Sequence, residues 1–147
     1  MRAVVDANVW IAAFDPAEPH YADSIAFLNE AAAQNAGLFG PSLILPEVAA
    51  TCARVARDVR KGEEAIARLQ QIPGMQFAHL TAERAAEAGK MASRLFLKGA
   101  DSFYAALAAE LGAELVTLDR ELRERTIGEL TSLSPVEWLA RHVPKSP

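Results

Sequence analysis

Arg2-Ala-Val-Val-Asp-Ala-Asn-Val-Trp10 is the stretch that decides the fold class of this chain. Residues 2–5 form a short, largely apolar run that ends at Asp6, and such a run predicts a buried β-strand. A second apolar stretch over residues 8–14 predicts a short helix directly after it. The chain therefore begins with a strand–helix unit that carries a carboxylate at its junction.

The same alternation continues to the end of the chain. Because strands alternate with helices, we predict an α/β fold of three layers with a mainly parallel sheet. We expect a single domain over residues 1–142 and a frayed tail over 143–147. The further predicted strands are 38–39, 75–80, 113–118 and 130–133, and the predicted helices are 20–36 (stopped by Gly37), 43–60, 62–71, 81–97, 101–111 (stopped by Gly112), a short charged helix and 135–141.

The composition limits the class of protein. Of 147 residues, 51% are hydrophobic and 23% charged, which is enough apolar material for one core without a disulfide or structural metal. Cys52 is the only cysteine, so a thiolate metal cage is excluded, and we expect Cys52 to be a core residue.

The net charge and the apolar runs bear on partners and location. No apolar run reaches the roughly 18 residues that cross a bilayer, and Asp6 interrupts the stretch where a signal peptide would be apolar. We therefore expect a cytosolic protein that does not engage a membrane. The net charge of −4 argues against a broadly basic surface for nucleic acid, although metal-neutralised carboxylates can still act on it.

Four acids stand in positions that suit chemistry. Asp6 and Asp119 directly follow predicted strands, and in open parallel sheets ligand sites gather at the carboxyl ends of the strands. Glu47 and Asp101 lie near the starts of helices in unusually apolar surroundings. Each of the three Asp residues has a structural alternative, because Asp is a favoured helix N-cap. Glu47 is harder to explain in this way, since a buried Glu is rare unless it is paired or bound to metal.

Together the four acids predict a cation site. Two carboxylates about 4 Å apart repel by roughly 4 kcal/mol at an effective dielectric of about 20. A hard divalent cation relieves this repulsion and accepts oxygen ligands, which favours Mg²⁺ or Mn²⁺. Zinc is disfavoured because His20, His79 and His142 are scattered and accompany no cysteine cluster.

Four segments of the chain resemble the ordered acidic motifs of the PIN-domain family, in particular the VapC-type toxins of toxin–antitoxin pairs. The resemblance covers nearly the whole chain, including the segment Leu130-Thr-Ser-Leu-Ser-Pro-Val-Glu-Trp138. It implies a five-stranded parallel sheet flanked by helices, RNA cleavage dependent on Mg²⁺ or Mn²⁺, homodimers and a small antitoxin partner. The four segments are Val4-Val-Asp-Ala-Asn-Val-Trp10, Leu45-Pro-Glu-Val48, Gly99-Ala-Asp-Ser-Phe-Tyr-Ala-Ala106 and Leu115-Val-Thr-Leu-Asp119.

The chain departs from this family pattern at two places. Many relatives carry Ser or Thr directly after the first Asp, where this chain has Ala7. Some carry another acid shortly after the fourth, for which Glu121 is the nearest substitute. We expect Asn8, Thr117 and Ser102 to donate hydrogen bonds around the metal ligands, or alternatively to satisfy local backbone groups.

Two basic stripes are candidates for holding a phosphate backbone. Lys90, Arg94 and Lys98 recur along one predicted helix, and Arg54, Arg57 and Lys61 follow Glu47. The alternative is a solvated helix face paired with nearby acids, namely Glu63, Glu64 and Glu87. Exposed aromatics for base stacking cannot be assigned from sequence, because Trp10, Phe96 and Phe103 fit core or interface positions equally well.

The function predicted from these residues is a metal-dependent endoribonuclease with Asp6, Glu47, Asp101 and Asp119 in its active site. One rival is a phosphatase with a nucleophilic Asp6, but that class needs a second Asp where this chain has Asn8. The other is a non-catalytic PIN-like module for RNA binding or scaffolding, in which the acids are caps and solvated charges.

Overall fold

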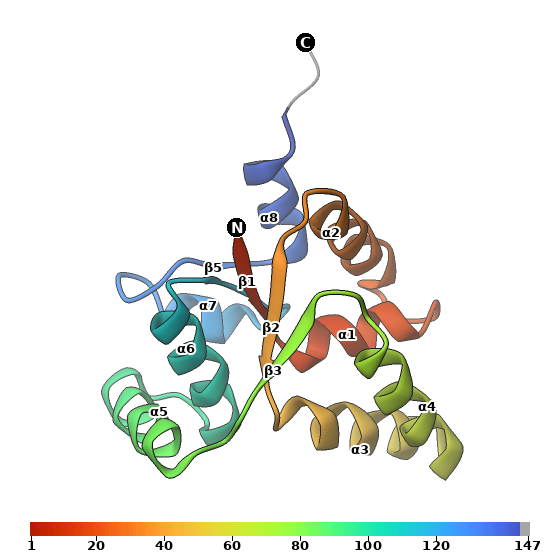
Figure 1. Ribbon diagram of the computed structural model, residues 1–147, viewed down its shortest axis with the longest axis horizontal. Helices are drawn as coiled ribbons and strands as arrows, with labels where there is room; N and C mark the ends of the chain where they lie inside the picture. Colours follow the sequence, from red (N-terminus) through yellow and green to blue (C-terminus); the bar gives the residue numbers. More distant parts are fainter. Residues whose placement is uncertain (145–147) are drawn as a thin grey trace.

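Five strands form one parallel sheet in a computed structural model that describes residues 1–144 (Figure 1). Their order is β3-β2-β1-β4-β5, so the first strand of the chain lies in the middle. The predicted parallel α/β sheet is confirmed. The strands are β1 (Arg2–Val5), β2 (Gly37–Pro41), β3 (Met75–Ala78), β4 (Glu114–Val116) and β5 (Ser132–Leu133).

Strand β1 is apolar because both of its faces are covered. Ala3, Val4 and Val5 are all fully buried, and Val4 is paired with Phe39 on one side and Leu115 on the other. A continuous apolar run, rather than an alternating one, is what a strand buried on both faces requires.

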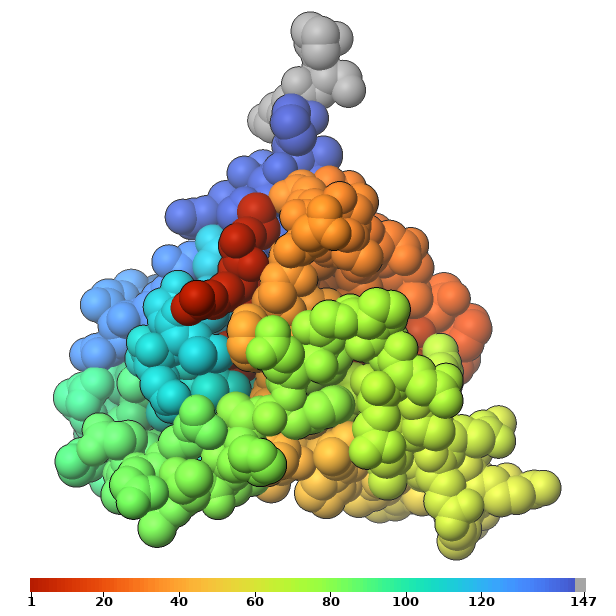
Figure 2. Space-filling model, viewed as in Figure 1, coloured from red at the N-terminus to blue at the C-terminus, as the bar shows by residue number. Residues whose placement is uncertain are grey.

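Helices cover both faces of the sheet and complete three layers. Helix α6 packs against β1, β2 and β4, and in Figure 1 α5 and α6 lie on one side of the strands while α1 to α4 lie on the other. In the space-filling view, the yellow α4 segment forms the lower right corner of the molecule and the green α5 segment the lower left (Figure 2). The helices are α1 (Ala7–Phe14), α2 (Tyr21–Ala33), α3 (Ile44–Ala56), α4 (Val59–Gln70), α5 (Ala82–Leu95), α6 (Gly99–Leu111), α7 (Arg120–Arg125) and α8 (Pro135–His142).

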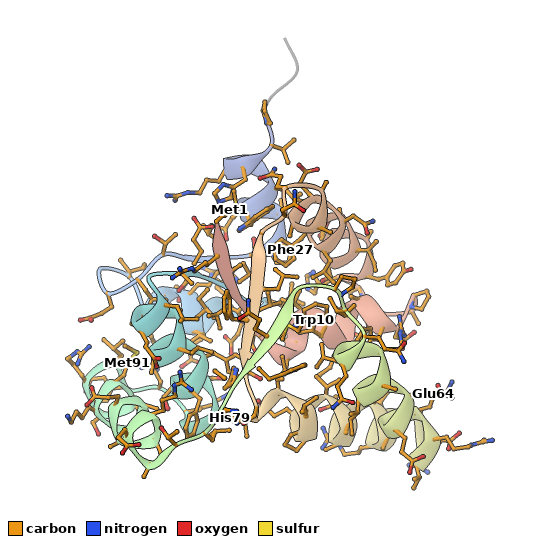
Figure 3. The ribbon with its side chains drawn as sticks, in the orientation of Figure 1. Met1, Trp10, Phe27, Glu64, His79 and Met91 are labelled. Atoms are coloured by element: carbon orange, nitrogen blue, oxygen red, sulfur yellow. The ribbon has the colours of Figure 1, made fainter. Side chains whose placement is uncertain are left out.

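Aromatic side chains fill the space between the sheet and the helices on the α1–α4 side. Trp10, Phe27 and Trp138 are fully buried, and the rings of Phe27 and Trp138 meet edge to face with centroids 5.0 Å apart. Figure 3 shows Trp10 and Phe27 among the interior side chains, whereas Glu64 points outward from α4. Trp10 is thus a core residue and is excluded as a surface for base stacking.

The break between α3 and α4 lies earlier than the sequence predicted. The chain leaves α3 at Arg57, which is left-handed with φ 52°, and Asp58 caps α4 by accepting a hydrogen bond from the Arg60 backbone N–H at 3.0 Å. We had expected the first helix to continue to about residue 60 and the next helix to begin at Gly62. The Asp58 cap starts the new helix first, because its carboxylate satisfies an otherwise unpaired N–H of the first turn.

Two other glycines have roles that differ from the predictions. Gly37 was expected to stop the second helix, but α2 ends at Gln34, left-handed Asn35 follows, and Gly37 begins β2. Gly99 was expected to separate two helices, but it is the first residue of α6, and the chain leaves α5 at Phe96. Both shifts arise because non-glycine residues take the left-handed positions.

Two further expectations concern the C-terminal tail and membrane-spanning helices. Helix α8 reaches His142, and residues 145–147 of the expected frayed tail lie outside the described residues. Within residues 1–144, no helix is both long and apolar enough to span a membrane.

Gly62 is needed where α3 and α4 cross. A Cβ atom at Gly62 would lie 2.8 Å from the Ala49 carbonyl oxygen, which belongs to rigid helix backbone. The helices can approach this closely only because residue 62 has no side chain, so the glycine is a packing residue inside α4 and not a helix stop.

We expect Gly62→Ala to lower the free energy of unfolding by about 1–3 kcal/mol, because the helices must move apart. Gly89→Ala is the matched control: Gly89 lies exposed in α5 with nothing within 4 Å of its Cβ position, so alanine should raise stability by about 0.5–1 kcal/mol. Urea unfolding of both variants measures the difference, and a stabilised Gly62→Ala variant would contradict the assigned packing role.

Candidate active site

The two central strands bring Asp6 and Asp119 to the same edge of the sheet. Val5 is paired with Val116 in parallel register, and the Asp6 backbone N–H donates to the Val116 carbonyl oxygen at 2.9 Å. Asp6 directly follows β1, and Asp119 follows β4 after a short link. The sequence prediction that both acids stand at the carboxyl ends of strands therefore agrees with the structure.

Thr117 and Asn8 hold one oxygen of Asp6. The Thr117 hydroxyl donates to Asp6 Oδ2 at 2.7 Å, and Asn8 Nδ2 donates to the same oxygen at 3.1 Å. Thr117 Oγ1 also accepts from the Asp119 backbone N–H at 3.0 Å, and Asn8 Oδ1 accepts from the Leu118 N–H at 3.1 Å. No side chain among residues 1–144 donates a hydrogen bond to Asp6 Oδ1, so this oxygen remains open to a ligand.

Burial raises the pKa of Asp6 to about 7. The Thr117 hydrogen bond acts in the opposite direction, and the negative charges of Asp101 and Glu47 raise the pKa further. Asp6 is only 6% exposed, so water does little to screen these charges. At neutral pH the protonated and ionised forms of Asp6 are therefore of comparable stability, and a bound cation would favour the ionised form.

Glu47 lies in the first turn of α3 and is held by a tyrosine that the sequence analysis did not identify. The hydroxyl of Tyr104, a fully buried residue of α6, donates to Glu47 Oε1 at 2.6 Å. This proximity to a carboxylate and burial together place the pKa of Tyr104 well above its usual range. Burial also raises the pKa of Glu47, the Tyr104 hydrogen bond lowers it, and the charge of Asp101 raises it.

Two features of the sequence could have identified Tyr104. It lies one helical turn after Asp101 and therefore faces the same side of the helix. A tyrosine in an otherwise apolar helix needs a partner for its hydroxyl when it is buried. Glu47 itself is partly exposed, where the sequence analysis expected it to be buried.

The helix-capping alternative applies to Asp119 but not to Asp101. The N-cap of α6 is Lys98, without a side-chain cap, so Asp101 stands inside the first turn and its carboxylate has no capping role. Asp119 is the N-cap of α7, and its Oδ1 accepts from the Leu122 N–H at 3.1 Å. The cap therefore accounts for one oxygen of Asp119 and leaves the carboxylate of Asp101 unexplained.

Electrostatics connects all four acids. Burial raises the pKa of Asp101, the charge of Asp119 raises it further, and Lys98 lowers it. Asp101 in turn raises the pKa values of both Asp6 and Glu47. These couplings join the carboxylates of β1, α3, α6 and the β4–α7 link into one acidic cluster, which we define as Asp6, Glu47, Asp101 and Asp119.

The acidic cluster fits a hard divalent cation by the chemistry of its donors. All four residues offer carboxylate oxygens, and a 2+ charge would offset the repulsion that contributes to the raised pKa values of Asp6, Glu47 and Asp101. Within residues 1–144, no three His, Cys, Asp or Glu side chains are already arranged as a metal-binding group.

The remaining residues predicted around the site have different surroundings. The Ser102 hydroxyl donates to the Gly99 carbonyl oxygen at 2.6 Å, which is the local-backbone alternative rather than a contact with the acids. Glu121 accepts from Arg125 at 2.7 Å, and its charge also raises the pKa of Asp101. Ala7 is buried and offers no side-chain donor.

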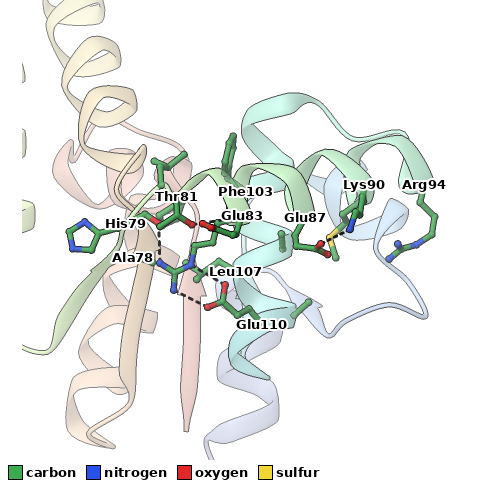
Figure 4. A pocket seen from close by; sticks show the side chains of 16 residues that line it. Ala78, His79, Thr81, Glu83, Glu87, Lys90, Arg94, Phe103, Leu107 and Glu110 are labelled. Carbon is green, nitrogen blue, oxygen red and sulfur yellow. Dashed lines mark hydrogen bonds and ion pairs between the residues drawn. The ribbon is translucent and has the colours of Figure 1, made fainter.

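The residues of the first basic stripe do not all lie at the same site. Lys90 pairs with Glu87 at 2.7 Å and Arg94 with Glu129 at 2.9 Å, and both cations line a pocket of ≈ 540 Å³ between α5 and α6 (Figure 4). None of the four acids lines that pocket. Lys98 instead lines a small depression together with Asp101 and Asp119, so it is the one residue of this stripe placed beside the acidic cluster.

The second basic stripe also mixes paired and unpaired residues. Lys61 pairs with Glu64 at 3.0 Å, as the solvated-face alternative predicted. Arg54 and Arg57 form no ion pair with any residue from 1 to 144, and Arg57 ends α3. Neither arginine is placed in the depression beside Asp101.

A family model of the PIN domain matches residues 3–127, which is well over half of the chain and includes all four acids. The chain belongs to the PIN-domain family. Among curated protein sequences, none matches this PIN domain.

Solved structures share the fold of this PIN domain. VapBC2 from Rickettsia felis, bound to a DNA fragment from its promoter, is 16% identical with a TM-score of 0.71, covering 91% of this chain and 98% of that one. VapC20 from Mycobacterium tuberculosis, a sarcin–ricin-loop-cleaving toxin, is 15% identical with a TM-score of 0.69 over 83% and 93%. VapBC-1 from nontypeable Haemophilus influenzae is 19% identical with a TM-score of 0.67 over 92% and 99%. At these identities the likeness is one of fold.

We expect Asp6 to make the metal-free PIN domain less stable as pH rises. The folded state keeps a proton on Asp6 up to about pH 7, whereas the unfolded chain releases it near the ordinary pKa of 3.8. Between these values the unfolded state gains from ionisation, so Asp6 removes up to about 4 kcal/mol of stability by neutral pH.

Urea unfolding in chelator at about pH 5 and about pH 8 tests this. Wild type is compared with Asp6→Asn, and the free energy of unfolding of the wild type should fall relative to that of the variant as pH rises. A difference that stays constant with pH would contradict the raised pKa.

Proposed function

We propose that this PIN-domain protein is a metal-dependent endoribonuclease and the toxin of a type II toxin–antitoxin pair. The observation that carries the proposal is the acidic cluster: four carboxylates from separate elements lie around one sheet edge, and burial together with the charges of neighbouring acids raises the pKa values of Asp6, Glu47 and Asp101. Among residues 1–144, neither a capping hydrogen bond nor an ion pair accounts for the carboxylates of Asp6, Glu47 and Asp101. A cation site gives all of them a function.

In this proposal Asp6, Asp101 and Asp119 would hold Mg²⁺ or Mn²⁺, with Glu47 beside them. The bound cation would supply a Lewis acid that lowers the pKa of water and offsets the charge of the phosphate. Thr117 and Asn8 fix Asp6 through Oδ2 and leave Oδ1 for the cation. Tyr104 fixes Glu47 in the same manner through Oε1.

The reaction we propose is hydrolysis of a phosphodiester. A water oxygen bonds to phosphorus in line with the leaving oxygen, and the bond between phosphorus and the 3′-oxygen breaks. The products are a 5′-phosphate and a 3′-hydroxyl. The pKa of Glu47, which lies beside the proposed ligands, is raised above its ordinary value, which suits a carboxylate that accepts the proton released by the attacking water. The leaving 3′-oxygen takes up a proton from solvent.

The structural relatives support the choice of substrate and partner. VapC20 is described as a toxin that cleaves the sarcin–ricin loop, which supports RNA as the substrate class. The relative from Klebsiella pneumoniae is a toxin–antitoxin complex, and VapBC2 was solved on promoter DNA. We propose by analogy that this chain acts in the cytoplasm as a homodimer and binds a small antitoxin.

The deciding experiment measures cleavage of single-stranded RNA with Mn²⁺ by wild type, Asp6→Asn and Asp101→Asn. We expect each variant to lose at least about 100-fold in rate, because each removes a charged ligand of the cation. EDTA should abolish cleavage by the wild type, and the products should carry 5′-phosphates. Glu64→Gln, an exposed acid paired with Lys61 on α4, is the matched control and should keep full activity.

Undiminished cleavage in chelator or in both Asp variants would reject the metal mechanism. Absence of both RNA cleavage and calorimetric Mn²⁺ binding would instead favour the non-catalytic module. Trapping a phosphoaspartate at Asp6 would favour the phosphatase.

A separate prediction concerns the tyrosine that holds Glu47. Tyr104→Phe keeps the buried ring and removes the donor to Glu47, which raises the pKa of that carboxyl because the hydrogen bond lowers it. We expect about a 3- to 20-fold loss of cleavage rate near neutral pH and partial recovery at higher pH, where Glu47 ionises again. A pH–rate profile identical in shape to that of the wild type would exclude this role.

A further inference from the structure

Phe96 is an aromatic side chain that folding leaves in water. It is 79% exposed, and among the large hydrophobic residues exposed within residues 1–144 it is the only aromatic. The other two aromatics considered for base stacking differ from it: Trp10 is fully buried and Phe103 is partly covered. Burial of a phenyl group is among the larger sources of stability in a protein core, so packing does not explain a phenylalanine here.

The backbone at Phe96 also disfavours a side chain of this kind. Phe96 ends α5 in the left-handed region, with φ 56° and ψ 43°, and its N–H donates to the Ala92 carbonyl oxygen. Glycine is the usual residue at this position of a helix end, because a Cβ atom is crowded there. Asn35 and Arg57, the other non-glycine residues with positive φ in residues 1–144, are polar, and asparagine tolerates this conformation comparatively well.

The position of Phe96 gives a functional reason for an exposed aromatic residue at this helix end. Phe96 lines the same small depression as Asp101 and Asp119, two members of the acidic cluster, and Lys98 lines it as well. The depression has a volume of only ≈ 20 Å³, so it is a shallow surface feature and not an enclosed pocket. An exposed ring, a cation and the proposed metal ligands thus share one open surface.

We propose that Phe96 is a stacking surface for one base of a single-stranded RNA, next to the phosphate that is cut. The proposal rests on the nuclease function proposed above and adds a positioning residue to it. Single-stranded RNA is recognised by unstacked bases that lie against aromatic rings, while cations hold the neighbouring phosphates. Phe96 provides the ring and Lys98 the cation, and together they fix which phosphate lies at Asp101 and Asp119.

A protein partner fits this surface less well. Of the eight residues that line the depression, five are charged: Lys98, Asp101, Asp119, Glu121 and Arg125. The centre of a protein interface is depleted in charged residues, and an aromatic anchor is normally surrounded by apolar contacts. A nucleotide instead combines an apolar base face with an anionic phosphate, which matches a phenyl ring beside a lysine.

The test is a double-mutant cycle between Phe96 and the base it would contact. RNA substrates in which single nucleotides around the cut site are replaced by abasic nucleotides are cleaved by wild type, Phe96→Gly and Phe96→Trp. In the wild type, one abasic position should lower kcat/KM by about 5- to 100-fold. With Phe96→Gly the intact RNA should show a similar loss, and the same abasic position should then cost less than about 2-fold, because there is no ring left to stack on. Phe96→Trp should keep the wild-type pattern.

Folding controls accompany the cycle. Phe96→Gly suits the left-handed backbone and removes an exposed ring, so we expect its melting temperature to equal or exceed that of the wild type. Phe96→Leu keeps apolar bulk without an aromatic face, and it should behave as the glycine variant does in cleavage.

The possible outcomes distinguish the stacking role of Phe96 from the proposed nuclease function. If wild type cleaves RNA and Phe96→Gly cleaves it equally well, the stacking role is overturned and the nuclease function stands. Additive effects of Phe96→Gly and the abasic positions would also overturn stacking. If Phe96→Gly changes the mass measured by light scattering while cleavage is unchanged, the ring belongs to an interface between protein copies. If wild type does not cleave RNA at all, the nuclease function fails and the stacking role fails with it.

Discussion

The hydrogen bond from the Thr117 hydroxyl to Asp6 Oδ2 is the interaction on which the rest of the site depends. At 2.7 Å it joins the residue after β1 to the residue after β4, which are the two central parallel strands. Thr117 also accepts from the Asp119 N–H, so one hydroxyl sets the positions of two of the four acids. Because Asp6 is buried, this donor opposes the strong tendency of the carboxylate to become neutral.

Repulsion among the acids then explains why they come from separate elements. Strand ends supply Asp6 and Asp119, whereas the first turns of α3 and α6 supply Glu47 and Asp101. Each carboxylate is thereby anchored by its own backbone, and none of the four can relieve the repulsion without disturbing a strand or a helix. One edge of the sheet therefore attracts positive charge, and the apolar core beneath it supplies none.

Much of this arrangement could be predicted from the sequence, for identifiable reasons. The apolar run before Asp6 and the one before Asp119 indicated strand ends, and parallel strands place such ends at one edge. The spacing from Asp101 could have identified Tyr104, but its partner could not be predicted, because the hydrogen bond to Glu47 joins α6 to α3 across 57 residues of sequence. The break at Arg57 was missed although the Asp58 cap is a local signal, because a non-glycine residue takes the left-handed position and the close helix crossing at Gly62 is a tertiary feature. Likewise, only the structure separates Phe96 from Trp10, since exposure follows from packing and not from residue type.

The central position of β1 has a consequence for the order of synthesis. Strand β1 is synthesised before β2 and β4, the two strands that flank it, and the Asp6 N–H finds its acceptor only at Val116. A nascent chain must therefore hold its N-terminal segment without native partners on one side until most of the polypeptide has emerged. A translation product that ends before β4 lacks Asp119 and one flank of β1, so the acidic edge assembles only after β4 and Asp119 have been made.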